Sequence, residues 1–165
     1  MFDRILLALD DSSSGEMAVA FACGLAPRCG ARVHVLHVNE YLVAGGGTTL
    51  RSREEALALV TAAVDDLRRC GVGASASVRV AHYRKVAHCI VEAAEEQHAG
   101  AIILGSRRQR RLGRLFSPQV RERVTRLGSL PVLTAPSPLA VPRRPDLSPS
   151  ELVMAEIERA LSIPS

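Results

Sequence analysis

The chain has 165 residues, which favours a single domain with a buried core. Aromatic residues make up only 3% of it and Trp is absent, so the core must be aliphatic and single-stranded nucleic acid is disfavoured as a stacking ligand. The formal net charge of +4 permits anionic partners without requiring them. No apolar run approaches membrane-spanning length, and acidic residues come too early for a signal peptide, so we expect a cytoplasmic protein without a membrane partner.

The first 50 residues predict a strand, a helix, a second strand and a loop. Residues 4–10 ("RILLALD") are short and aliphatic, as in a buried parallel strand. Met17, Phe21 and Leu25 then recur every four residues, which is typical of one face of a helix. Residues 31–38 ("ARVHVLHV") are rich in β-branched side chains and predict the second strand. The "AGGGTT" that follows is interpreted either as a plain connector or as a mobile loop near a ligand.

The same alternation of strands and helices continues along the chain. Further helices are predicted over residues 51–70, 86–94 and 120–127, and further strands over 74–81, 101–105 and 130–135. Repeated strand–helix–strand units with aliphatic strands imply a parallel sheet covered by helices on both faces. Because ligands of such sheets bind at the carboxyl ends of the strands, the candidate positions lie around Asp10, around residues 38–40 and after Gly105.

The last 30 residues differ from the rest in composition. Five prolines fall within residues 136–149, which is typical of a linker. Ser148 and Glu151 then form a capping-box pattern at the start of an amphipathic helix. We therefore predict a domain over residues 1–136, followed by a linker and C-terminal helix over residues 137–165. This helix is expected to fold back on its own domain, to dock on a partner, or to stay partly disordered.

Metal and redox motifs are absent from the sequence. The four cysteines lack a C-x-x-C or zinc-like spacing, and we interpret them as small core or half-buried thiols in a reducing compartment. The spacing of the histidines predicts no metal site. No convincing nucleophile–base pair is present, so the chain is not expected to be a dedicated enzyme.

Several segments together resemble the universal stress protein family. They are "RILLALDDSSSGEMAVAFA", "ARVHVLHV", "VRVAHYRKVAHCIVEAAEEQHAGAIILGSR" and "RVTRLGSLPVLTAP", which lie between about residue 3 and residue 136. The resemblance implies an α/β fold of the flavodoxin-like or adenine-nucleotide α-hydrolase-like kind, with a five-stranded parallel sheet in the order 3-2-1-4-5. It also implies a homodimer formed through the last strand, from Pro131 to Thr134. The family has ATP-binding and non-binding branches and is linked to stress survival rather than to one reaction. Some members hydrolyse ATP slowly, so the resemblance implies slow ATP hydrolysis at most.

The phosphate-binding turn of the ATP-binding branch is altered in "GSRRQRRLGRLFSPQV". The branch has G-x-x-G, nine residues, and then G-S/T, because glycines let backbone N–H groups approach phosphate closely. Gly105 matches the first glycine, but Arg108 and Pro118 stand at the other two, and Gln119 replaces Ser/Thr. Arg108 adds a side chain where bare backbone is needed, and Pro118 has no N–H. Ser117 before it forms an N-cap pair that lets the helix satisfy its own start.

Other family positions survive in this chain. Asp10 matches the acidic residue near the ribose and phosphates, and Val38 matches the strand end whose backbone meets adenine. Asp11 replaces the usual glycine, and its carboxylate repels phosphate unless a metal intervenes. The candidate cofactor-binding residues are Asp10, Val38, Gly105, Arg107, Arg108, Ser117 and Gln119. No catalytic or metal residue is assigned.

Three functions follow from these residues. The first is a dimeric regulatory module in which Arg107, Arg108 or Pro118 encroaches on the phosphate position, so that no cofactor binds or ATP binds weakly. The second is a protein that binds ATP with Mg²⁺, or another small anion, through arginines that replace the lost amides. The third is an adaptor that docks partners through its C-terminal helix. Basic residues without interleaved aromatics argue against a nucleic-acid partner.

Overall fold

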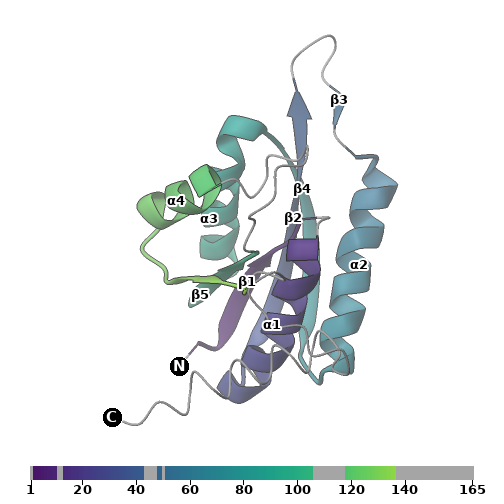
Figure 1. The fold of residues 1–165 in the computed structure, drawn as a ribbon, viewed down its shortest axis with the longest axis vertical. Helices are drawn as coiled ribbons and strands as arrows, with labels where there is room; N and C mark the ends of the chain where they lie inside the picture. The colour runs from purple at the N-terminus through teal and green to yellow at the C-terminus, as the bar shows by residue number, and fades with distance from the viewer. Residues whose placement is uncertain (1, 11–12, 43–47, 50, 106–117, 137–165) are drawn as a thin grey trace.

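The computed structural model describes residues 2–10, 13–42, 48–49, 51–105 and 118–136, and these form one sheet with helices on both faces (Figure 1). Five strands of the sheet are mutually parallel and run β4-β2-β1-β5-β6 across it, which is the expected order 3-2-1-4-5 of the five predicted strands. These strands are β1 (Arg4–Ala8), β2 (Arg32–Leu42), β4 (Ala74–His82), β5 (Ala101–Leu104) and β6 (Val132–Thr134).

In the described part of the chain, two helices cover each face of the sheet. The helices are α1 (Ser13–Cys29), α2 (Arg53–Arg69), α3 (Val86–Glu96), which follows the short 3₁₀ turn η1 (Tyr83–Lys85), and α4 (Pro118–Leu127). Figure 1 shows α1 and α2 on one side of the sheet and α3 and α4 on the other. This arrangement follows from right-handed crossovers on either side of β1, where the direction of chain progression reverses.

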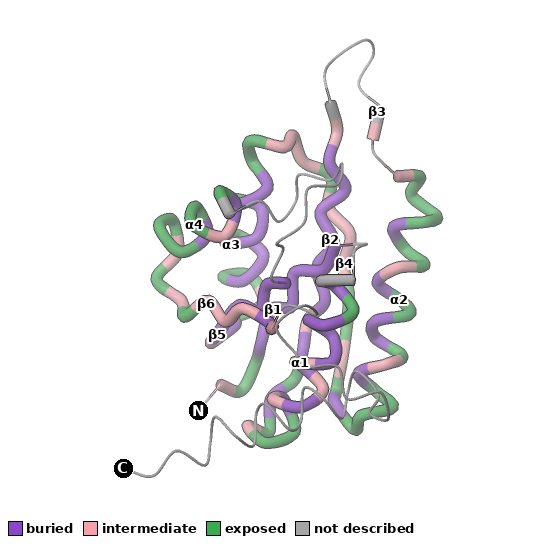
Figure 2. Tube along the Cα trace, viewed as in Figure 1, coloured by how far each residue is buried: buried purple, intermediate pink, exposed green. Residues whose placement is uncertain are grey.

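The strands feed two separate cores because successive side chains point to opposite faces. Leu6 and Ala8 of β1 pack with Ile90 and the rest of α3 and α4, whereas Ile5 and Leu7 pack with α1 and α2. Figure 2 shows the resulting buried strands in the middle of the molecule and exposed residues on the outer sides of the helices. Both cores are aliphatic, as the composition predicts.

The second strand is longer than its sequence predicts. We expected it to end at Val38, but β2 continues to Leu42 and pairs with β4 as far as Tyr41. The prediction was wrong because Asn39 and Glu40 are polar, yet they are 3% and 1% exposed. Beyond the end of β1, the free edge of β2 pairs instead with the antiparallel strand β3 (Thr48–Thr49), which lies in the predicted glycine-rich loop.

The buried Asn39 fastens the start of α2 to β2. Its side-chain amide donates to the Arg51 carbonyl oxygen at 2.9 Å and accepts from the Arg51 N–H at 3.2 Å. Immediately after, Ser52 and Glu55 form a reciprocal capping box at the first turn of α2. The Asn39–Arg51 hydrogen bonds and the capping box therefore set where α2 begins, and neither depends on the hydrophobic pattern.

The cysteine prediction was wrong for two of the four residues. Cys23 of α1 and Cys70 at the end of α2 form a disulfide, with their Cα atoms 5.6 Å apart. The two positions are 47 residues apart, and only the packing of α1 beside α2 brings them together. Cys29 and Cys89 are free thiols, half-buried and buried respectively.

Within the described part of the chain, no helix has the length and apolar character that a membrane crossing requires. The C-terminal helix predicted after Ser148 lies outside the described residues, as does the proline-rich linker.

Candidate functional site

Three of the predicted site residues meet at the carboxyl edge of the sheet. Asp10 follows β1, Val38 lies in β2 just beyond its last residue paired with β1, and Gly105 directly follows β5. The register places them at one edge, because Ala8 of β1 aligns with Leu36 on one side and with Leu104 on the other. Asp10 is 4% exposed and Val38 is 2% exposed, and Gly105 is also buried. Ligands of such sheets bind outside these strand ends at the topological switch point, so this edge is the candidate nucleotide crevice.

The backbone of α1 at Gly15 lies very close to Asp10. A Cβ atom on Gly15 would lie 2.2 Å from the Asp10 carbonyl oxygen and 3.0 Å from one of its carboxylate oxygens. Only glycine permits this approach, so Gly15 fixes the distance between helix and strand end. The sequence analysis missed Gly15, although a glycine within the first turn of a predicted helix was the signal that could have revealed it.

His37 ties the ends of β1 and β2 together. Its Nδ1 lies 2.9 Å from the Leu9 carbonyl oxygen, and because a carbonyl can only accept, Nδ1 carries the proton. The ring is 1% exposed. His34, three residues earlier, lies between Ser75 and Ser77 of β4 at 2.8 Å from each hydroxyl. The His34 ring therefore contacts β4, whereas the His37 ring contacts the residue that follows β1, and the strand pleat predicts that the two rings lie on opposite faces of β2. The described residues include no cluster of three or more His, Cys, Asp or Glu able to hold a metal ion.

The altered phosphate turn follows Gly105 in the sequence. Arg107, Arg108 and Ser117 lie outside the described residues. α4 is described from Pro118 onward, and the Ser117–Pro118 N-cap pair stays a prediction because Ser117 is not among the described residues. Gln119, the second described residue of α4, is exposed. Proline has no N–H group, so position 118 cannot supply the amide that the family pattern obtains from glycine there.

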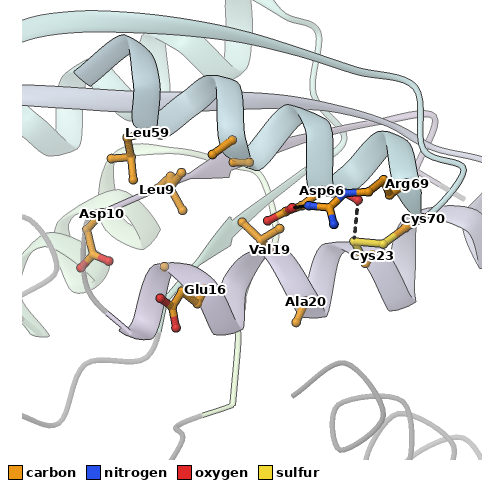
Figure 3. A pocket seen from close by; sticks show the side chains of 13 residues that line it. Leu9, Asp10, Glu16, Val19, Ala20, Cys23, Leu59, Asp66, Arg69 and Cys70 are labelled. Carbon is orange, nitrogen blue, oxygen red and sulfur yellow. Dashed lines mark hydrogen bonds and ion pairs between the residues drawn. A yellow bond between two sulfur atoms is a disulfide. The ribbon is translucent and has the colours of Figure 1, made fainter. Parts of the chain in front are cut away.

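A cavity of about 500 Å³ lies between α1 and α2 rather than across the β1–β5 crevice. Figure 3 shows Asp10 and Glu16 toward one end of it and the Cys23–Cys70 disulfide toward the other. Its middle is mainly apolar and includes Val19. Asp10 lines this cavity and also follows β1 at the carboxyl edge of the sheet. The candidate nucleotide site is the carboxyl edge, because the strands that lead to Asp10 and Gly105 end there.

Solved structures of similar proteins support this fold. A universal stress protein family member from Burkholderia pseudomallei is 26% identical with a TM-score of 0.65, covering 82% of this chain and 96% of that one. A universal stress protein from Archaeoglobus fulgidus is 27% identical with a TM-score of 0.63, covering 82% of this chain and 100% of that one. An Archaeoglobus fulgidus universal stress protein in complex with dAMP is also 27% identical, with a TM-score of 0.63 and coverage of 81% and 97%.

Comparison with curated protein sequences found no match. The sequence profile of the universal stress protein family, in contrast, matches residues 1–136. This span contains every described strand and helix, the crevice at the carboxyl edge and the altered turn. The chain belongs to the universal stress protein family.

Proposed function

We propose that this chain is a cytoplasmic, dimeric regulatory module of the stress response whose crevice binds ATP weakly or not at all. The observation that carries the proposal is the proline at position 118, the first described residue of α4. A helix N-terminus binds phosphate through its free N–H groups, and proline contributes none. Arg108 adds a second departure, because a side chain there competes with phosphate for the space above the backbone.

The two halves of the crevice make different demands on a nucleotide. In this proposal the strand-end half, with Asp10, Val38 and Gly105, needs only a buried carboxylate and backbone at a strand end, and the burial of these three residues supports it. The phosphate half needs closely approaching amides, which Pro118 and Arg108 reduce. Loss of affinity is therefore expected to grow with the number of phosphates on the ligand.

The dimer in this proposal forms through the last strand. The Ala135 N–H donates to the Leu104 carbonyl oxygen at 2.9 Å, and the Pro131 carbonyl oxygen accepts from the Ile102 N–H at 3.0 Å. The odd-numbered residues of this segment therefore direct their backbone groups toward β5. The alternate residues Val132 and Thr134 then direct their backbone groups to the other edge of β6, where a second copy can pair with them. Sedimentation velocity tests this: a single species at the monomer mass of 17.7 kDa contradicts it.

A second candidate is a protein that binds ATP with Mg²⁺, or another adenine nucleotide, with arginines in place of the lost amides. The similar Archaeoglobus fulgidus protein in complex with dAMP favours it. In this version Arg107 and Arg108 hold the phosphates as charged forks, and Mg²⁺ offsets the negative charge of Asp11. Any ATP hydrolysis would depend on that same phosphate contact.

Calorimetric titration with ATP and Mg²⁺, beside ADP, AMP and cyclic AMP, separates the two candidates. We expect no heat and no thermal shift with ATP at millimolar concentration. Micromolar ATP binding would overturn the first candidate. Arg108→Ala then tests the second, with Arg123→Ala as a control that removes one equal charge from the exposed side of α4. A loss of affinity of at least about tenfold in Arg108→Ala alone supports arginine contacts, whereas equal binding by both variants contradicts them.

A further inference from the structure

The Cys23–Cys70 disulfide has two chemically unequal ends. Cys70 is the C-cap of α2 and is an exposed residue. Cys23 lies within α1 and is half-buried against the adjacent helix. Figure 3 shows the bond bridging the two helices at the end of the α1–α2 cavity. An attacking thiolate must reach a sulfur along the S–S axis, so access decides which sulfur reacts.

The surroundings of Cys23 suit a leaving group that stays in place. Its Sγ lies 3.8 Å from the Asp66 carbonyl oxygen on α2. Once the bond opens and this sulfur takes up a proton, its S–H can donate to that oxygen. α1 continues beyond Cys23 to Cys29, so the residue is held by helix on both sides. Cys23 therefore remains next to Cys70 after the bond is broken.

We propose that Cys23 and Cys70 form a thiol–disulfide exchange site, in which Cys70 accepts a small thiol and Cys23 resolves the mixed disulfide. The site requires no nucleotide and goes beyond the function proposed above. Disulfides in reducing compartments are usually transient and redox-sensing, so the bond is compatible with a cytoplasmic location when it exchanges in this way.

The exchange balances with a low-molecular-weight thiol as reductant. Its thiolate attacks Cys70 Sγ and forms a new S–S bond to it, while the Cys23–Cys70 bond breaks and Cys23 leaves as a thiolate that takes up a proton. A second small thiolate then attacks the small-molecule sulfur, which frees Cys70 as a thiolate and releases the oxidised small-molecule disulfide. In reverse, the Cys23 thiolate attacks Cys70 Sγ and expels the small thiol.

The two remaining cysteines serve as internal references. Cys89 is buried in the α3/α4 core, and this burial raises the pKa of its thiol, which keeps it in the less reactive protonated form. Cys29 is half-buried at the last residue of α1. Neither is expected to form a disulfide in the folded chain, so both report on general reactivity under the same conditions.

The first experiment tests whether the bond forms and opens. The full-length protein is equilibrated with glutathione disulfide, unfolded in an alkylating agent without reductant, and mapped by mass spectrometry. We expect alkylation of Cys29 and Cys89 only, and alkylation of all four cysteines after treatment with excess reduced glutathione. Alkylation of all four after the oxidising step would overturn the proposal.

The second experiment identifies the sulfur that is attacked. Folded Cys23→Ser is expected to gain one glutathionyl group on Cys70 from glutathione disulfide. Cys70→Ser is expected to react on Cys23 at least about tenfold more slowly, because that sulfur is less accessible. Equal rates, or a faster reaction at Cys23, would overturn the assignment. Cys29→Ser is the matched control, since it leaves the bridge intact.

A third measurement decides the matter if either serine variant does not fold. Oxidised wild-type protein is mixed with reduced glutathione and quenched with acid during the reaction, and the mixed disulfide is located by peptide mapping. Glutathione on Cys70 supports the proposal, whereas glutathione mainly on Cys23, Cys29 or Cys89 contradicts it.

Discussion

The two faces of the sheet are held together by different means. On one face, α3 and α4 pack with the strands in a continuous core of buried side chains that includes Ile90 and Ala94. On the other face, α1 and α2 also pack on the sheet but leave a cavity of about 500 Å³ between them, with a disulfide at one end. Packing keeps the first pair of helices in place, whereas the second pair adds a covalent bond where packing is incomplete.

This difference separates two sources of stability. A cavity forgoes dispersion contacts along its walls, so α1 and α2 gain less from packing against each other than they would without it. A disulfide acts mainly by restricting the unfolded chain, and it does so whether or not the folded helices fit tightly. The stability contributed by the α1/α2 face should therefore depend on redox conditions, and this face should tolerate larger side chains. The stability contributed by the α3/α4 face should not depend on redox conditions, and larger side chains there should destabilise the protein.

The largest expected effect is on the α1/α2 face and comes from reducing the disulfide. Opening a bridge between residues 47 apart is expected to lower the free energy of unfolding by about 4 kcal/mol. Urea denaturation with and without a phosphine reductant measures it. Cys29→Ser should show the same dependence on reductant as the wild type. An unchanged midpoint after thiol counting has shown full reduction would contradict this contrast between the faces.

The next effect compares one substitution on both faces. Ala63 lines the α1–α2 cavity, so Ala63→Met can place its flexible side chain there and should raise the free energy of unfolding by about 1 kcal/mol. Ala94 is 0% exposed within the α3/α4 core, so Ala94→Met should lower it by about 2 kcal/mol through overpacking. Denaturation of both variants at fixed redox state provides the comparison. Changes of the same sign in the free energy of unfolding of the two variants would contradict the difference in packing between the two faces.

The smallest effect depends on pH and concerns His34. Burial, with a smaller contribution from Arg79, lowers the pKa of His34 below its ordinary value of 6.5. The unfolded chain then takes up a proton below pH 6.5 that the folded chain resists, so stability is lost as pH falls and is fully present above 6.5. His34→Gln should flatten this slope between about pH 7 and pH 5. The exposed His88→Gln is the control, and an equally steep slope in both variants and the wild type would exclude His34 as the cause.

Most of the fold could be predicted because the spacing of hydrophobic residues along the chain indicates which segments form strands and which form helices. The run over residues 101–105 and the spacing from Val120 to Leu127 correspond directly to β5 and α4. The end of β2 could not be predicted, since Asn39 is polar and becomes buried only because Arg51 satisfies its amide. The disulfide could not be predicted either, because it depends on which helices become neighbours in space.

The candidate site was predictable where it follows from topology. Asp10, Val38 and Gly105 lie at one edge because parallel strands end together there. Gly15 was missed, since its role depends on a helix approaching a carbonyl group and not on any residue pattern. The roles of Arg107, Arg108 and Ser117 remain predictions from the family motif, and the separate C-terminal segment over residues 137–165 remains a prediction from composition.

The double hydrogen bond between Asn39 and Arg51 has a consequence for protein engineering. It anchors the start of α2 to β2 through groups that lie outside the intervening segment. When both ends of a segment are anchored independently, lengthening it costs only chain entropy, about 0.6 kcal/mol for each doubling of its length. The three consecutive glycines at 45–47 are therefore a suitable place to insert an epitope or a fluorescent label without displacing the crevice or the helices around it.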